Sequence, residues 1–144
     1  MKLTLEAERE GAFALTDGEY GVSITRPEAA SDGWVEGFTV EIREPGLSAT
    51  AKVEVSRYVD TPATLFRELS ENWSGWTGEK SWRSMEGELE LVATSDRLGH
   101  ISLCIRLTPS VCSDTWAVTT YVGLEAGQLN SLYARARSFF RVKA

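Results

Sequence analysis

The sequence predicts an α+β fold in which two antiparallel β-meanders, with about seven to eight strands in total, are accompanied by two amphipathic helices. Three observations support this class. Apolar and polar residues alternate over most of the chain, short turn sequences separate the alternating stretches, and the apolar period becomes helical in only two places, near residues 62–73 and 125–141. Neighbouring strands joined by short links pair most simply as antiparallel neighbours.

The first half contains alternating stretches separated by glycine, proline and acidic residues. Tyr20, Val22 and Ile24 mark one strand, which Pro27 is expected to end before a polar loop at 27–33. Strands are predicted at residues 2–8, 12–15, 20–24, 38–42 and 49–55.

A helix is predicted to begin after Thr61, which suits the N-cap position, with Pro62 as its first residue. Leu65, Phe66, Leu69 and Trp73 then follow on one helical face. Trp73 is therefore expected to lie in the core, and Gly75 to stop the helix.

The second half repeats the scheme, with a short strand around Trp82, strands at 88–94, 101–107 and 116–122, and a turn at 96–99. The last helix has one apolar face, formed by Leu129, Leu132, Tyr133, Ala136 and Phe140. Each half thus consists of three strands followed by a helix, at 20–73 and 87–140. This spacing suggests an internal duplication.

Length and composition predict one domain spanning residues 1–144. No apolar run is long enough to span a bilayer, and the N-terminus lacks a signal-peptide core, so we expect a cytoplasmic protein without membrane association. Two cysteines, Cys104 and Cys112, are too few for a fold held together by disulfides. A single disulfide between them is nevertheless one of the alternatives. With one histidine and two separated cysteines, neither a metal site nor a cofactor is expected.

The net charge of −6 and the pI near 4.9 argue against nucleic-acid binding, which requires neutralisation of phosphates. Basic residues gather near the C-terminus, where they complement the negative end of the last helix. An acidic exterior suits a basic protein partner.

A few polar residues are candidates for catalysis, but none of them belongs to a known catalytic motif. His100 stands near Asp96 across a turn, with Ser95 or Ser102 as the available nucleophiles, so capping, ligand recognition and catalysis are three open interpretations. Glu86 is expected to be a partly buried hydrogen-bond acceptor, whereas Glu88 and Glu90 lie on the polar face of a strand. Phosphate-binding glycine motifs and a GxSxG sequence are absent from the chain.

The chain has five tryptophans, a residue type that is enriched at binding hot spots. Trp76 and Trp82 lie in glycine-flanked sequence and are expected to face a ligand, unless they anchor the helix to the sheet instead.

Three stretches carry a family resemblance: the tryptophan- and glycine-rich segment 73–91, the turn and strand at 94–103 containing Gly99 and His100, and the LEAGQL segment 124–129. Together they resemble a family of small uncharacterised actinobacterial proteins. More remotely, the arrangement is similar to immunity proteins of the WapI type, which neutralise polymorphic toxins, although LEAGQL differs from the helix start of that group. The resemblance implies no catalytic residues.

The sequence therefore favours a non-enzymatic binding protein, an immunity- or antitoxin-like inhibitor of a basic protein. The alternative is a small-ligand or carbohydrate-binding module that stacks its ligand on exposed tryptophans. The residues expected at the binding site are Trp76, Trp82, Glu86, Asp96 and His100.

Overall fold

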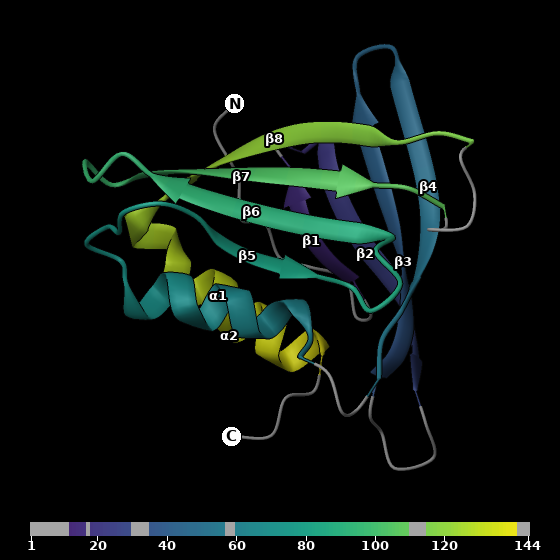
Figure 1. The fold of residues 1–144 in the computed structure, drawn as a ribbon, viewed down its shortest axis with the longest axis horizontal. Helices are drawn as coiled ribbons and strands as arrows, with labels where there is room; N and C mark the ends of the chain where they lie inside the picture. The colour runs from purple at the N-terminus through teal and green to yellow at the C-terminus, as the bar shows by residue number, and fades with distance from the viewer. Residues whose placement is uncertain (1–11, 17, 30–34, 57–59, 110–114, 141–144) are drawn as a thin grey trace.

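The computed structural model describes residues 12–16, 18–29, 35–56, 60–109 and 115–140, and it confirms the α+β class (Figure 1). The described strands form two antiparallel four-stranded sheets, each with its strands in chain order. The first sheet contains β1 (Ala12–Thr16), β2 (Gly21–Ala29), β3 (Val35–Glu44) and β4 (Leu47–Glu54). The second contains β5 (Lys80–Arg83), β6 (Leu89–Ser95), β7 (His100–Leu107) and β8 (Val118–Glu125). The strand predicted at residues 2–8 and the residues Trp34 and Cys112 lie outside the described ranges.

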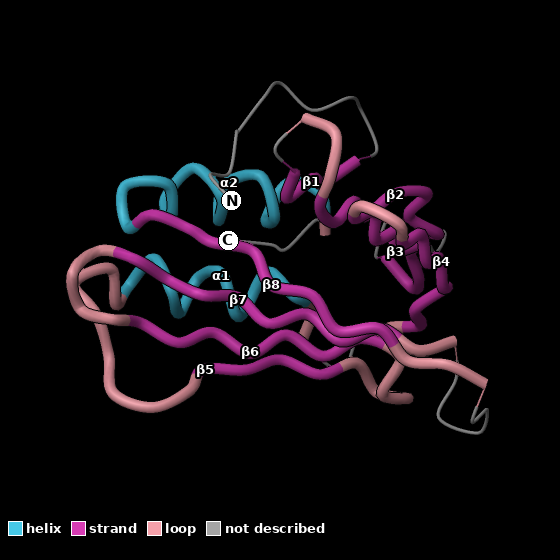
Figure 2. The backbone as a smooth tube through the Cα atoms, turned by 90° about the horizontal axis from the view of Figure 1, so that it is seen from above, coloured by secondary structure: helices cyan, strands magenta, loops and turns pink. Residues whose placement is uncertain are grey.

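Two helices complete the fold: α1 (Pro62–Glu71) and α2 (Leu129–Phe139), the latter preceded by the short 3₁₀ helix η1 (Ala126–Gln128). The strands of the two sheets cross steeply, and both helices lie on one side of the second sheet (Figures 1 and 2). The helices pack against each other, α1 also against β5 and α2 against β1. The helices therefore join the two sheets through one apolar core.

The centre of this core is aromatic. Five phenylalanines from four elements meet there, with ring centroids between 4.8 and 6.4 Å apart: Phe13, Phe38, Phe66, Phe139 and Phe140. The second sheet contributes the buried side of β7, formed by Ile101, Leu103, Ile105 and Leu107, as the alternation predicts.

The first helix begins as predicted but ends early. The Thr61 hydroxyl accepts a hydrogen bond from the Ala63 N–H at 3.3 Å, and Pro62 is the first helical residue. Asn72 then leaves the helical conformation and closes the helix, and its N–H donates to the carbonyls of Glu68 and Leu69. Trp73 thus lies beyond the helix and is 64% exposed, so its predicted place in the core is wrong.

The predicted end of the second strand at Pro27 is also wrong, because β2 continues to Ala29. Its pairing with β3 shifts register between Thr25 and Glu28 and again between Glu28 and Ala29. Such an irregularity accommodates proline, which has no N–H to donate to the sheet.

Both halves of the chain have the same order of elements. Within the predicted bounds 20–73 and 87–140, each half has the predicted three strands followed by a helix, and one further strand, β1 or β5, precedes each set and completes a four-stranded meander. The matching strand order is consistent with the suggested duplication.

A buried carboxylate connects the two sheets. Glu88 is only 4% exposed, in contrast to its predicted place on a polar strand face. One carboxylate oxygen accepts a hydrogen bond from the Ser84 hydroxyl at 2.8 Å, and the other accepts from the backbone N–H of Glu54, in β4, at 3.0 Å. Glu86, predicted to be the partly buried acceptor, is exposed in the same turn.

The core assignment of β7 can be tested with two leucines of one hairpin. We expect Leu103→Ala to lower the free energy of unfolding by about 2–5 kcal/mol, because it removes buried methyl groups and leaves a cavity. Leu98→Ala, at an 81% exposed position, should change it by less than about 0.5 kcal/mol. Denaturant unfolding measures both values, and equal effects would contradict the assignment.

The junction at Glu88 can be tested in the same way. We expect Glu88→Ala to destabilise the protein by about 1–3 kcal/mol, because the Ser84 hydroxyl and the Glu54 N–H lose their acceptor. Glu86→Ala, two residues away and exposed, is the matched control and should be close to neutral. A neutral Glu88→Ala variant would show that the carboxylate does not hold the sheets together.

Candidate functional site

Three segments meet at one end of the molecule, at the left in Figure 1: the α1–β5 loop (72–78), the β6–β7 turn (95–100) and the start of the last helical region (125–128). We call this region the hairpin end. The backbone N–H of Ala126 donates to the Gly99 carbonyl at 2.8 Å, and Gly75 lies against Arg97, so the turn is attached to both neighbouring segments.

The β6–β7 turn is organised by the Asp96 carboxylate. Its Oδ1 accepts hydrogen bonds from the backbone N–H groups of Leu98 at 2.7 Å and His100 at 3.1 Å. Arg97, between them, has a φ of 65°, in the left-handed region that few residues other than glycine adopt. The aspartate therefore holds the backbone in a conformation that it would otherwise rarely take.

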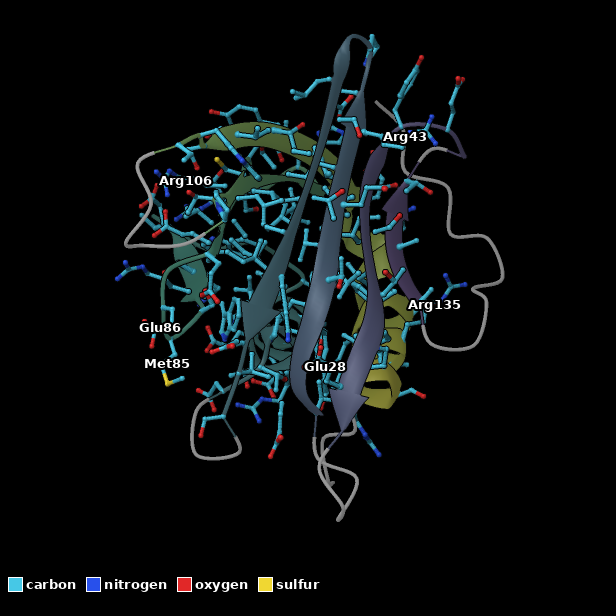
Figure 3. The ribbon with its side chains drawn as sticks, turned by 90° about the vertical axis from the view of Figure 1, so that its right-hand side faces the viewer. Glu28, Arg43, Met85, Glu86, Arg106 and Arg135 are labelled. Atoms are coloured by element: carbon cyan, nitrogen blue, oxygen red, sulfur yellow. The ribbon has the colours of Figure 1, made fainter. Side chains whose placement is uncertain are left out.

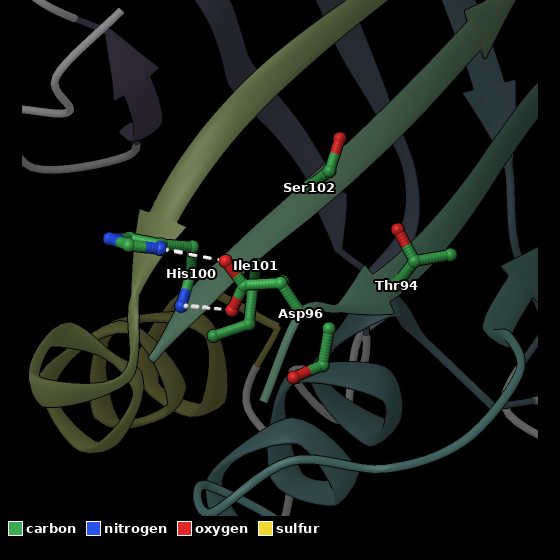
Figure 4. Close-up of a pocket in the computed structure, with 6 residues that line it drawn as sticks. Thr94, Asp96, His100, Ile101 and Ser102 are labelled. Atoms are coloured by element: carbon green, nitrogen blue, oxygen red, sulfur yellow. Dashed lines mark hydrogen bonds and ion pairs between the residues drawn. The ribbon is translucent and has the colours of Figure 1, made fainter. Parts of the chain in front are cut away.

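His100 lies between two carboxylates. Its Nδ1 is 2.7 Å from Asp96 Oδ2, and its Nε2 is 3.8 Å from Glu125 Oε2 in β8 (Figure 4 shows the contacts with Asp96). The hydrogen bond and charge of Asp96, followed by the charge of Glu125, raise the pKa of His100 above 6.5. The hydrogen bond from the Leu98 N–H, followed by that of His100, lowers the pKa of Asp96 below 3.8.

This geometry is better suited to holding a proton than to activating a nucleophile. A general base needs a free ring nitrogen directed at the hydroxyl that it deprotonates. Here both ring nitrogens face carboxylates, and Ser102 projects separately from β7 (Figure 4). The two hydroxyl groups considered as nucleophiles instead line an open cleft of about 280 Å³, together with Thr94, Asp96, His100 and Ile101.

The hairpin end also carries the two most exposed large apolar side chains in the described part of the chain. Leu98 is 81% exposed at the tip of the turn, and Trp73 is 64% exposed in the adjacent loop. The Arg97 guanidinium donates a hydrogen bond to the Thr77 hydroxyl, which links the two loops. Both apolar groups are thus presented by connected backbone segments.

The structure separates the five predicted site residues. Asp96 and His100 come together as expected, whereas Glu86 lies in the β5–β6 turn, at the other end of the sheet. Trp76 and Trp82 are only 8% and 7% exposed, so the expectation that they face a ligand is wrong.

Both indoles are fixed from within. The Trp76 N–H donates to the Ala93 carbonyl at 3.3 Å, and the Trp82 N–H donates to the Asp60 carbonyl at 2.8 Å. Their rings anchor β5 and the preceding loop to the core, and this excludes a carbohydrate platform built on them.

Three residues of the hairpin end were missed from the sequence: Glu125, Trp73 and Leu98. Glu125 pairs with His100 in the β7–β8 register, and this pairing follows once Leu103 is aligned with Val122. Trp73 was missed because the helical period extends past the true helix end at Glu71. The sequence shows only that Leu98 lies in a turn, and nothing in it identifies this leucine as a binding-site residue.

Among the residues that the structure describes, no group of three or more His, Cys, Asp or Glu side chains could hold a metal ion. Cys104 is a free thiol. None of the described helices is long and apolar enough to cross a membrane.

These features define an α+β protein with two meanders, whose surface cluster centres on one histidine. The model of a family of unknown function, DUF6228, matches residues 14–143, and the chain belongs to that family. No curated protein matches the chain. No solved structure matches it either.

The protonation of His100 can be measured directly, because it is the only histidine in the chain. We expect an NMR titration of the imidazole to give a pKa above 6.5, and Asp96→Asn to move that pKa back toward 6.5. The amide oxygen of asparagine can still accept the two backbone hydrogen bonds of the turn. An unchanged pKa in the variant would contradict the coupling.

The sign of the linked effect on stability follows from the raised pKa. The folded state holds the His100 proton more tightly, so the contribution is fully present below about pH 6.5 and is lost as the pH rises through the folded-state pKa. Unfolding midpoints should therefore fall between pH 6 and 8 less steeply for His100→Ala than for the parent protein.

Proposed function

We propose that this protein is a non-enzymatic binding protein of the cytoplasm that inhibits a basic protein partner, as an immunity protein or antitoxin does, and that the hairpin end contacts the partner. The observation that carries the proposal is the pairing of two exposed apolar side chains, Leu98 and Trp73, with the carboxylates of Asp96 and Glu125 at the same end of the molecule.

Most of the binding energy of a protein interface comes from a few large side chains at its centre, and polar and charged groups surround them at the rim. Tryptophan is among the residues most enriched at such centres, because it buries a large area with few rotatable bonds. Presentation on linked loops reduces the entropy lost on binding, since the Arg97–Thr77 hydrogen bond already restrains both segments.

The charge of the chain supports a basic partner. The net charge of −6 favours the approach of a cationic protein, and Asp96 and Glu125 supply negative charge next to the apolar groups. Inhibition then requires only that the bound chain covers the active surface of the partner, which agrees with the implied similarity to immunity proteins.

The experiment uses the basic proteins encoded beside this gene as probes. Each is co-expressed with the chain, the copurified pair is isolated, and its dissociation constant and residual toxicity or enzymatic activity are measured. We expect one neighbour to bind and lose its activity. If none of them binds and none is inhibited, the proposal is wrong.

The contact surface is tested by Leu98→Asp, which should weaken binding about tenfold or more, because a charge replaces an apolar anchor. Met85→Asp is the matched control, since Met85 is 51% exposed in the β5–β6 turn at the opposite end of the sheet (Figure 3). Equal losses in both variants, or a loss only in the control, would place the interface elsewhere.

A further inference from the structure

His100 connects two segments of the hairpin end that are distant in sequence. Asp96 belongs to the same β6–β7 turn, whereas Glu125 is the cross-strand partner of His100 at the end of β8. One ring nitrogen, Nδ1, is 2.7 Å from Asp96 Oδ2, and the other points away from Asp96 (Figure 4). That second nitrogen, Nε2, is 3.8 Å from Glu125 Oε2. The imidazole therefore bridges the turn and the strand that leads into the last helical region.

Two carboxylates are the charged groups that face the imidazole in the described part of the chain. Apart from His100, the three segments of the hairpin end contain three charged residues, Asp96, Arg97 and Glu125. The guanidinium of Arg97 donates its hydrogen bond to the Thr77 hydroxyl in the α1–β5 loop. The next positions on the same side of β7 and β8, Ser102 and Gly123, are uncharged. The charges that act on the pKa of His100 are accordingly those of Asp96 and Glu125.

The two ring protons of the imidazolium are held unequally. At 2.7 Å, the Nδ1–H group donates a charge-assisted hydrogen bond to Asp96. The other oxygen of that carboxylate is fixed by the backbone N–H groups of Leu98 and His100. At 3.8 Å, Nε2 and the Glu125 carboxylate form an ion pair that is too long for a hydrogen bond. The neutral imidazole should therefore keep its proton on Nδ1 and lose the one on Nε2.

Loss of the Nε2 proton changes the contact with Glu125 and leaves the contact with Asp96 in place. An imidazolium attracts the Glu125 carboxylate, whereas a neutral Nε2 directs a lone pair toward it. The Glu125 side chain is 56% exposed, so it has room to turn into solvent. Its backbone stays fixed, because the Glu125 N–H donates to the side chain of Gln128 at 2.9 Å. The carboxylate is thus the part of this residue that can move.

We propose that His100 is a pH-dependent switch of the hairpin end: the imidazolium ties the β6–β7 turn to Glu125, and the neutral imidazole stays bound to Asp96 and releases the Glu125 carboxylate. The tie to Glu125 is present below the pKa of His100 and is lost above it. The switch is a property of the chain alone and needs no partner.

The switch changes the charge that the hairpin end presents. Two carboxylates and one imidazolium carry a net charge of −1 (−2 + 1), and the same groups carry −2 after the proton is lost. The released Glu125 carboxylate is also no longer neutralised by His100. Combined with the proposed function, on which this step rests, the change makes the binding of a basic partner tighter above the pKa of His100 than below it.

NMR spectroscopy of the isolated chain tests the switch. We expect the nitrogen chemical shifts of the imidazole to identify its neutral form as the Nδ1–H tautomer. The couplings that report the χ1 angle of Glu125 should change from those of one rotamer to averaged values, with the same midpoint as the His100 titration. The side chain of Glu86, exposed at the other end of the sheet, is the internal control and should show no change at that midpoint (Figure 3).

Three variants separate the switch from a merely structural effect. Glu125→Gln keeps the backbone hydrogen bond to Gln128, so it should lower the pKa of His100 and retain the Nδ1–H tautomer. Asp96→Asn places an amide NH₂ group opposite Nδ1, so the neutral imidazole should change to the Nε2–H tautomer. Glu86→Gln is the matched control and should alter neither the pKa nor the tautomer. The amide spectrum of each variant checks that it is folded.

A neutral imidazole that carries its proton on Nε2 in the parent protein would overturn the inference. So would Glu125 couplings that stay the same through the His100 titration. These measurements contain no partner protein, so failure of the switch leaves the proposed function standing. Conversely, failure to find a basic partner would leave the NMR result unaffected.

Discussion

The structure depends on one shared core. Each sheet has one apolar face, and neither helix covers a sheet alone, because α1 packs on β5 and α2 on β1 while the helices pack on each other. The phenylalanines at the centre come from β1, β3, α1 and the end of α2, so the two halves of the chain bury the same aromatic cluster. Glu88 adds a polar link between the two sheets through its hydrogen bonds with the Glu54 N–H and the Ser84 hydroxyl.

Much of the fold could be predicted because its signals are local. The alternation of Ile101, Leu103 and Ile105 fixes the buried side of β7, and Thr61 with Pro62 fixes the start of α1. The error at Glu88 arose because a residue distant in sequence decides the outcome. Glu88 looks like a surface residue until the N–H of Glu54, 34 positions away, is brought to it.

The candidate site was predicted only in part for the same reason. Asp96 and His100 are four residues apart, and the turn chemistry that joins them can be read from the sequence. Glu125 joins them only through the β7–β8 register. Trp73 was expected in the core and is exposed, whereas Trp76 and Trp82 were expected to face a ligand and are buried. The glycines near Trp76 and Trp82 suggested open loops. Inside the protein, however, the indole N–H groups donate to the carbonyls of Ala93 and Asp60.

The identical order of elements in the two halves has a consequence for how the chain folds. Every described strand pairs only with its neighbours in sequence, so each meander can form through contacts that are short-range in sequence. The phenylalanine cluster, by contrast, forms only when the two halves of the chain pack against each other, because both halves contribute rings to it. During folding the two halves are therefore linked segments of one chain, and their covalent connection supplies the high effective concentration that brings them together into the shared core.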